Sequence, residues 1–453
     1  MANIVISFSH VLSNKGYPPG TFPVFYDHFI NELKNLGNNI YYIDNVPMSL
    51  KIKKQNERIL ISKIKKLHPD LIILFNNRFP DIDLSKHFDC PIIIYGVDTV
   101  LLYSNIDTLK NNNTYKYIVS SSDDIKSLKE TLNVSEDRIL KIPFFTGIKA
   151  EKTEIKNNIV FIGSCWDYTN LISEFTKLNP TNSEISYLNE IIKEIEENPF
   201  IQESNLKAKY QNKSENLVNI IDINKILWFI SSTKRVKILS KVSALGLKIY
   251  GTKNWRNLSF YPELSLAYSP ELIYSVKQNQ DCYNSAKIGI STSHAQAVAA
   301  FPWRITDIMA SNACLVTDYH SDFEKYFPGL EIPTYKTQQE AYDICKYLLN
   351  NEKERLEIVK ECNNVINKNF RFANHLADIE AFTGVKLRNN TQGEAKFLPI
   401  LNNKKQNKKL TTLEKFFSLT NTKDKKHKII TVMGVKIKIK REPHKETVKW
   451  KSQ

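Results

Sequence analysis

Arg304 and Asp307 stand three residues apart in a segment, Trp303–Ala310, whose pattern predicts a helix. A predicted strand, Lys287–Ile290, and a loop of small residues precede it, and Pro302 suits a first helical turn. The unpaired N–H groups of a helix start attract phosphate, and a guanidinium forks onto phosphate oxygens. A carboxylate one turn on could accept both hydroxyls of a ribose. We therefore expect a diphosphate-binding site here. The alternative is a solvent-exposed ion pair between the two side chains.

Two successive series of strands and helices would position this segment. In the first series the strands are continuous apolar runs, which is typical of parallel strands buried on both faces. The second series is interrupted by a polar, helix-prone insert at 170–232. We expect an α/β fold with two Rossmann-like domains, 1–148 and 149–388, whose strands point their carboxyl ends at a cleft, and a linker with a basic tail at 389–453. The predicted strands are Ile4–Phe8, Ile40–Ile43, Asp70–Phe75, Pro91–Gly96, Lys116–Ser120, Ile139–Ile142, Ile159–Ile162, Leu247–Tyr250, Lys287–Ile290 and Cys314–Thr317, and the main helices are Val24–Leu36, Glu57–Leu67, Ser122–Leu132, Arg235–Leu245, Trp303–Ala310, Gln338–Leu349 and Lys353–Lys368.

The positive charge of the chain is concentrated at its C-terminal end. Residues 401–453 hold 16 Lys and Arg against 4 Asp and Glu, which is +12 of the total +15 and leaves +3 for the rest. A nearly neutral body argues against a nucleic-acid groove, so we expect no nucleic-acid partner. A basic tail suits an anionic surface, or serves as a solubilising appendage.

Other chemistry finds little support in the sequence. The six Cys residues are scattered without a CxxC pair, which indicates reduced thiols and no structural zinc. Asp81-Ile82-Asp83 has the spelling of a metal-binding motif but follows Pro80 in a polar stretch and is expected to be an ordinary turn. No apolar run approaches the roughly 18 residues of a membrane span, and residues 1–10 lack the basic start of a signal peptide. We expect a cytoplasmic protein.

Several short segments resemble, in order, the C-terminal domain of group 1 glycosyltransferases, most closely the branch named after the spore maturation protein CgeB. These segments are YGVD (95–98), IVFIGS (159–164), KIYGTKNW (248–255), YNSAK (283–287), RITD (304–307), ASN (310–312) and TD (317–318). The resemblance covers roughly 92–384. Two positions depart from the family pattern, since Asp307 replaces a Glu and Asn312 replaces a capping Gly, and a further acidic residue expected near Cys314 is absent.

The resemblance implies a GT-B fold and transfer of a sugar from a nucleotide-sugar donor, without a metal or other cofactor. Asp307 would hold the donor ribose, and Arg304 with the helix start would hold the diphosphate. Gly163 and Ser164 would line the cleft. Lys253 or Arg256, after the turn at Gly251, would neutralise the leaving diphosphate.

Further candidates follow strands at the cleft. Asp98 could act as a general base on an acceptor hydroxyl or simply hold the acceptor, and His10 could do either. His294, in the loop before Arg304, could contact the sugar or a phosphate. The alternatives are a loop-capping role for Asp98 and ordinary packing for the two histidines. Trp255 and Trp303 could line the donor pocket, although such aromatic residues are more often core.

In the tail, Ile429–Met433, Gly434 and Val435–Ile439 predict a β-hairpin with one cationic face. Similar endings occur on bacterial surface-polysaccharide and lipooligosaccharide glycosyltransferases. This resemblance implies a protein at the inner membrane surface that builds lipopolysaccharide, lipooligosaccharide or capsule on a glycan, lipid-linked or protein acceptor. Two other readings stay open: another GT-B enzyme, such as a sugar-nucleotide epimerase, and a non-catalytic peripheral membrane protein with a decayed site.

Overall fold

The structure is a computed structural model, and it describes residues 1–9, 22–44, 46–47, 49–165, 170–222, 224–400, 417–421, 427–432 and 435–440. By its internal contacts the chain divides into a large unit, Met1–Leu398, and a small one, Pro399–Gln453. The large unit holds two sheets, each built from parallel strands. The fold is therefore α/β with two Rossmann-like domains, as the sequence predicts.

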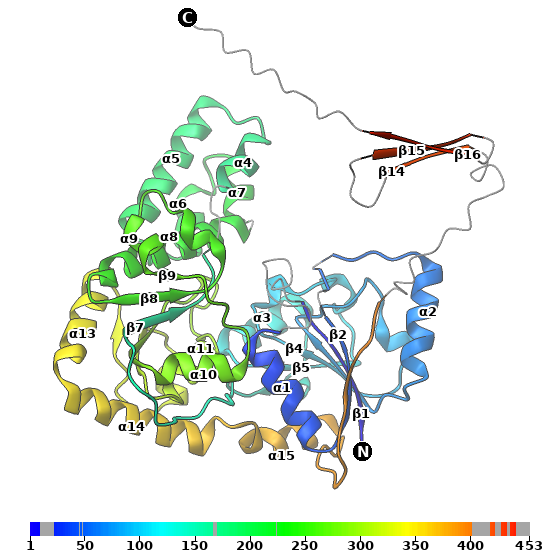
Figure 1. Cartoon of the computed structure of the whole chain (residues 1–453), viewed down its shortest axis with the longest axis horizontal. Coiled ribbons are helices and arrows are strands. Elements are labelled where there is room, and N and C mark those ends of the chain that lie inside the picture. Colours follow the sequence, from blue (N-terminus) through cyan, green and yellow to red (C-terminus); the bar gives the residue numbers. More distant parts are fainter. Residues whose placement is uncertain are drawn as a thin grey trace, which may run out of the picture. The chain divides into compact units, whose positions relative to one another are not determined.

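The first domain is a seven-stranded sheet with the strand order β13-β2-β1-β3-β4-β5-β6. Its strands β3 and β4 are wholly buried, which explains their unbroken apolar sequences. Figure 1 shows α1 and α2 on opposite faces of the sheet. The elements are β1 (Asn3–Ser7), α1 (Val24–Asn35), β2 (Asn39–Ile43), α2 (Lys54–Lys65), β3 (Leu71–Phe75), β4 (Ile92–Tyr95), β5 (Tyr115–Val119), α3 (Ser122–Leu132), β6 (Ile139–Lys141) and β13 (Ala395–Phe397).

The second domain is a six-stranded sheet with the strand order β12-β11-β10-β7-β8-β9. Its core joins the sheet to α8 and α13, with Trp255 fully buried in it. The elements are β7 (Asn157–Ile162), α8 (Asn224–Ser243), β8 (Leu247–Tyr250), α9 (Pro262–Ala267), β9 (Tyr268–Ser269), α10 (Val276–Asn284), β10 (Ala286–Ser291), α11 (Arg304–Met309), β11 (Cys314–Asp318), α12 (Phe323–Tyr326), β12 (Thr334–Tyr335), α13 (Gln338–Asn350) and α14 (Glu352–Asn369).

The insert is helical, as predicted, and has an apolar core of its own. It consists of α4 (Asn170–Thr176), α5 (Asn182–Glu197), α6 (Glu203–Tyr210), α7 (Glu215–Asp222) and the first half of α8. Figure 1 shows these helices gathered in one bundle. The helix predicted at Arg235–Leu245 is thus the second half of α8, which runs on from the insert without a break.

The predicted boundary at residue 388 is wrong, because the chain returns to the first domain before that point. Helix α15 (Phe372–Thr383) places Phe372, Leu376 and Ile379 in the same apolar core as β1 and α1. Farther on, β13 pairs in parallel with β2, so residues 395–397 form a strand where a flexible linker was predicted. Burial of these apolar side chains holds the segment against the first domain.

The small unit contains a three-stranded antiparallel sheet of β14 (Phe417–Asn421), β15 (His427–Val432) and β16 (Val435–Lys440). The pairing of β15 with β16 confirms the predicted hairpin, and β14 adds a strand that the sequence pattern did not reveal. Among the helices that the structure describes, none is both long and apolar enough to cross a bilayer.

Candidate active site

A cavity of about 530 Å³ lies between the two domains at the carboxyl ends of their strands. The first domain contributes residues that follow β3, β4 and β5. The second contributes α8, the loop 292–300 after β10, and the start of α11. The lining residues with polar or aromatic side chains are Arg78, Asp98, Thr99, Ser120, Ser121, Asp123, Asp124, Phe144, Trp228, Arg235, Thr292, His294, Gln296, Phe301, Trp303 and Arg304.

Two arginines on the second-domain wall, Arg304 and Arg235, both lie near the ring of Phe161. The Arg304 Nε donates to the Ile162 carbonyl oxygen at 2.8 Å, and the Arg235 Nε donates to Thr292 Oγ1 at 2.9 Å. Each guanidinium carbon is 5.2 Å from the ring centre of Phe161. Burial, followed by repulsion from Arg304, lowers the pKa of Arg235 well below its ordinary value. An anion bound at this wall would relieve that repulsion.

The end of β7 allows the close approach of these cations. A Cβ atom on Gly163 would stand 2.7 Å from the Phe161 ring and 3.1 Å from a terminal nitrogen of Arg304. The Gly163 oxygen accepts from Trp255 Nε1 at 2.9 Å, and the Ser164 oxygen accepts from Arg235 at 2.6 Å. Gly163 and Ser164 therefore support the cationic wall through their backbone, rather than lining the cavity as predicted.

A buried ionic network fixes the first turn of the loop 292–300. Asp318, at the end of β11, accepts from Lys234 Nζ at 2.7 Å and from the Ser293 backbone N–H and hydroxyl, each at 3.0 Å. Ser293 Oγ also lies 2.7 Å from His320 Nε2. Asp318 is 4% exposed and His320 2%. The network holds the loop that carries Thr292, His294 and Gln296 to the cavity.

Carboxylates gather on the opposite, first-domain wall. Asp98 accepts from Asn76 Nδ2 at 2.7 Å and, across the two domains, from Gln296 Nε2 at 2.9 Å. Asp123 accepts the Ala299 N–H at 3.0 Å, a second link across the cavity. Burial, together with Asp123 and Asp98, raises the pKa of Asp124 to about 7. The cavity thus offers cations on one wall and proton acceptors on the other.

His294 lines the cavity as a neutral group. Its Nδ1 accepts the Gln296 backbone N–H at 3.2 Å. Burial, followed by Arg235 and Lys234, lowers its pKa to about 3. At neutral pH His294 is therefore a hydrogen-bonding group, and the positive charge of this wall comes from the arginines.

Asp307 does not line the cavity, unlike the prediction made for it. It is 5% exposed, and its Oδ1 accepts from Thr146 Oγ1 at 2.5 Å. Helix α11 turns this side chain toward the strand-to-strand connection behind the cavity, so the side chains of Arg304 and Asp307 diverge within a single helical turn. The alternative of a solvent-exposed ion pair between them is not found either, because Arg304 donates to the end of β7 and Asp307 is buried.

The buried Asp307 gives the first testable prediction. Burial raises its pKa to about 7, against roughly 4 for an unfolded carboxyl. Between these values the folded protein holds a proton that the unfolded chain has released, so rising pH weakens folding, on the order of a few kcal/mol in total. Asp307→Asn should flatten the fall in urea midpoint between pH 5 and 7.5. Asp124 gives the wild type and the variant a similar dependence of stability on pH, so the difference between their two slopes reports on Asp307. Equal slopes in the two proteins would contradict the raised pKa of Asp307.

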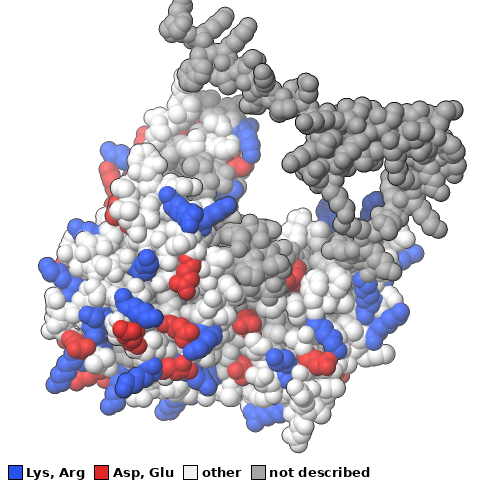
Figure 2. All heavy atoms as spheres, in the orientation of Figure 1, with Lys and Arg blue, Asp and Glu red and all other residues white. Residues whose placement is uncertain are grey.

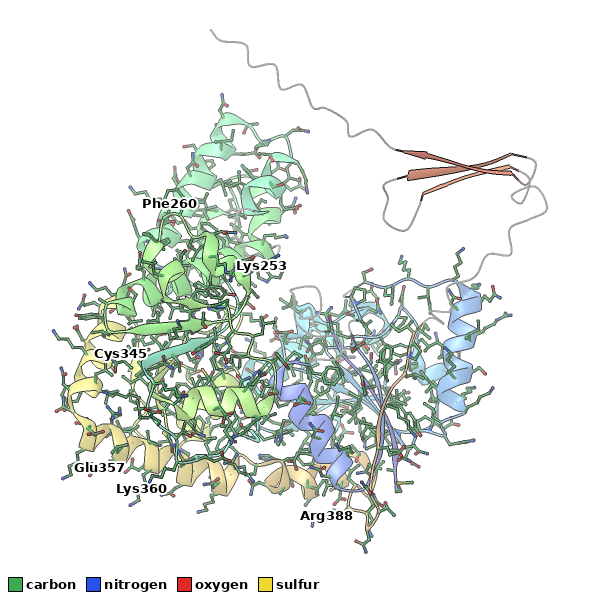
Figure 3. The ribbon with its side chains drawn as sticks, in the orientation of Figure 1. Lys253, Phe260, Cys345, Glu357, Lys360 and Arg388 are labelled. Atoms are coloured by element: carbon green, nitrogen blue, oxygen red, sulfur yellow. The ribbon has the colours of Figure 1, made fainter. Side chains whose placement is uncertain are left out.

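The remaining predicted residues do not meet at the cavity. Lys253, labelled in Figure 3, and Arg256 are exposed on the turn after β8 and are not among the lining residues. Arg256 instead places its guanidinium 5.6 Å from the Tyr268 ring centre. Their role at a diphosphate stays a prediction, and the second-domain cation that lines the cavity with Arg304 is Arg235. His10 lies outside the described residues.

Sequence reasoning missed Arg235, Asp123 and Asp124 as cavity residues. Lys234 and Arg235 are both buried, but they stand in the largely polar segment SSTKRVK (231–237) of α8, so the local sequence holds no signal of a site. Asp123 and Asp124 lie in the first turn of α3, where carboxylates suit the helix dipole, so their sequence position has a local explanation that does not point to a cavity. Trp303 does line the cavity and stacks on Phe25 at 5.5 Å.

Charged side chains of both signs are mixed on the visible face of the described residues, where Lys and Arg alternate with Asp and Glu (Figure 2). Among the described residues, no group of three or more His, Cys, Asp or Glu side chains is placed to hold a metal ion. The expectation of a metal-independent site remains a prediction.

Residues 234–381 match the model of a family described as glycosyl transferase-like. This segment contains Arg235, Thr292, His294, Arg304 and Asp318. No curated protein matches the chain. The fold resembles that of sucrose-phosphate synthase from Thermosynechococcus elongatus, with 9% identity, a TM-score of 0.51, and 85% of this chain and 99% of that chain covered. It also resembles Anabaena Alr3699/HepE, solved with UDP and glucose, with 10% identity, a TM-score of 0.51, and coverage of 85% and 100%. The chain therefore has the GT-B fold of these proteins.

Proposed function

We propose that the protein is a glycosyltransferase that takes a nucleoside-diphosphate sugar as donor and binds its diphosphate at Arg235 and Arg304. The observation that carries the proposal is the pair of guanidinium groups on one wall of the interdomain cavity. Guanidinium groups match phosphate oxygens in geometry and charge. The similarity in fold to a protein solved with UDP and glucose agrees with this donor class.

The same geometry suggests how transfer proceeds. When the sugar–phosphate bond breaks, negative charge develops on the leaving diphosphate, and the two arginines stabilise it. The acceptor hydroxyl gives up its proton as its oxygen bonds to the sugar. Asp98 and Asp124 lie on the facing wall, where Asp98 orients the hydroxyl and Asp124 takes the proton, since its pKa of about 7 suits proton exchange at neutral pH.

A direct test is ligand stabilisation followed by turnover. Purified full-length protein would be melted with UDP, GDP and their sugar conjugates, because a ligand that binds the folded state raises the melting temperature. Donor consumption and product would then be measured with and without EDTA. The proposal requires stabilisation by at least one nucleotide sugar and activity in EDTA. No stabilisation by any donor would favour the non-catalytic reading, and a rearranged donor with no transfer would favour an epimerase.

We further propose that the acceptor belongs to a bacterial surface glycan and that the basic tail holds the enzyme at an anionic inner-membrane surface. The support is the alternation of Lys with apolar residues along β16 and the charge of +12 in residues 401–453. Each Lys near an anionic leaflet contributes about 1 kcal/mol at low salt. Lipid-linked acceptors would be concentrated at that surface.

Removal of the tail tests this membrane role. A chain ending at Leu398, where the contacts divide, should lose most of its binding to vesicles with anionic lipid and keep its nucleotide binding. Vesicle sedimentation at low and at physiological salt measures the change, and the full chain should release in high salt. Equal sedimentation of the two proteins would exclude the tail as a membrane anchor.

A further inference from the structure

The helical insert is built into the wall of the cavity. Helix α8 begins in the apolar core of the insert, with Ile226 and Ile230, and continues into the core of the second domain, with Val236 and Leu239. One continuous helix therefore carries side chains from the insert to the diphosphate wall. Side chains on the cavity-facing side of the first half of α8 are therefore held at a fixed position relative to Arg235.

The insert side chain that reaches the cavity is Trp228. It is 39% exposed, although large aromatic side chains on a packed helix are usually buried. Lys225, one turn earlier, places its Nζ 5.4 Å from the Trp228 ring centre. The remaining indole surface is left open to the cavity and to solvent. An apolar surface held open beside convergent polar groups is typical of a ligand contact.

The position of Trp228 relative to the cations can be read from α8. Trp228 and Arg235 are seven residues apart, which places them on the same face of the helix, separated by about 10 Å along its axis. Between them, Ser231 Oγ accepts the Ala295 N–H at 2.8 Å and ties the loop 292–300 to the insert. The next residue of that loop, Gln296, bonds to Asp98 on the opposite wall. Trp228 thus stands at the insert end of the same cavity, beyond the diphosphate wall.

We propose that Trp228 is the platform on which a sugar ring of the acceptor stacks, so that the acceptor is a glycan. This inference rests on the proposed function. The C–H face of a pyranose is apolar and packs on an indole, while its rim of hydroxyls needs hydrogen-bonding partners, which Gln296 and Asp98 supply nearby. A ring stacked at a partly exposed residue can continue into solvent, as a longer glycan must.

A nucleobase of the donor could also stack on the Trp228 indole ring. The acceptor is favoured because Trp228 shares the cavity with Asp98, the carboxylate to which the proposed transfer assigns the acceptor hydroxyl. Binding experiments separate the two assignments, since they predict opposite effects on nucleotide and saccharide affinity.

The test compares Trp228→Ala and Trp228→Phe with Phe260→Ala in the full chain. Phe260, labelled in Figure 3, is 89% exposed and not among the cavity residues, so it controls for loss of an exposed aromatic side chain. Affinities for UDP and GDP would be measured by calorimetry. Binding of methyl hexosides and of linear hexose oligosaccharides would be measured by saturation-transfer NMR with the nucleotide present.

We expect Trp228→Ala to weaken saccharide binding roughly tenfold and Trp228→Phe to weaken it less. The nucleotide affinity of both variants should equal that of the wild type. Phe260→Ala should match the wild type. Unchanged saccharide binding in Trp228→Ala, no saccharide binding by the wild type, or a loss confined to nucleotide affinity would each overturn the proposal. Failure of the wild type to bind any nucleotide would instead refute the proposed donor site, and the calorimetric titration detects that failure independently of the saccharide experiment.

Discussion

Arg304→Ala should abolish measurable donor binding while leaving the protein folded. Arg304 is partly exposed at the cavity, where its side chain donates to the Ile162 oxygen and hydrogen-bonds the buried Tyr283 hydroxyl, so its removal should cost only about 1–3 kcal/mol of stability. A charge-assisted contact to a diphosphate is among the strongest that a side chain can make. We expect a loss of about a hundredfold or more in kcat/KM, because the same charge stabilises the leaving group in the transition state.

Lys253→Ala is the matched control for this substitution. It removes one positive charge from the same domain, at an exposed position outside the cavity. Its donor affinity and turnover should stay within about twofold of the wild type at physiological salt, since distant exposed charges are screened. Arg304→Lys should recover some of the binding, because an ammonium keeps the charge but loses the fork. Equal nucleotide affinity in Arg304→Ala and Lys253→Ala would refute the cationic wall.

The scaffold of this site could be predicted from local sequence because its signals are strong and short-range. Continuous apolar runs such as Leu71–Phe75 have one stable environment, the interior of a parallel sheet. The helical pattern predicts α3 with its observed bounds, and in the structure Ser121 caps this helix by accepting the Asp123 N–H at 3.1 Å. Strand β8 likewise ends where Gly251 follows it.

The arrangement of the site could be predicted only incompletely, because it depends on contacts distant in sequence. Arg304 was found through its place after a strand. Asp307, however, is set by Thr146, 161 residues away, and no local pattern records that hydrogen bond. The return of Phe372 to the first domain and the continuity of α8 through the insert are also tertiary outcomes. The sequence spacing identified helix α11 but not the direction in which the Asp307 side chain faces.

The anchoring of the loop by Asp318 leads to the largest expected effect on stability. Asp318→Asn removes the partner of Lys234, whose side chain is 9% exposed, and leaves a buried ammonium without its counter-charge. Breaking one side of a buried ion pair costs about 3–5 kcal/mol. The Asn side chain can still accept from Ser293, so the loss should come from the charge. Urea unfolding at pH 7 measures it, and Asp107→Asn, in an exposed ion pair, should change little.

The pH dependence of the same substitution separates the charge from a general packing defect. Burial alone would raise the pKa of Asp318, but Lys234 and His320 outweigh it and hold that pKa well below its ordinary value. The carboxylate therefore stabilises the fold above about pH 4, and this contribution is lost as the pH falls toward the folded pKa. The destabilisation by Asp318→Asn should shrink progressively in acid. Pairing it with Lys234→Met should restore much of the stability at pH 7, because an apolar side chain suits the buried position better than an unpaired charge. The double variant should also recover most of its donor binding, since the amide oxygen still accepts from Ser293 and holds the turn that presents Thr292 and His294. Donor binding that stays weak in the double variant would show that the buried charge itself positions the loop.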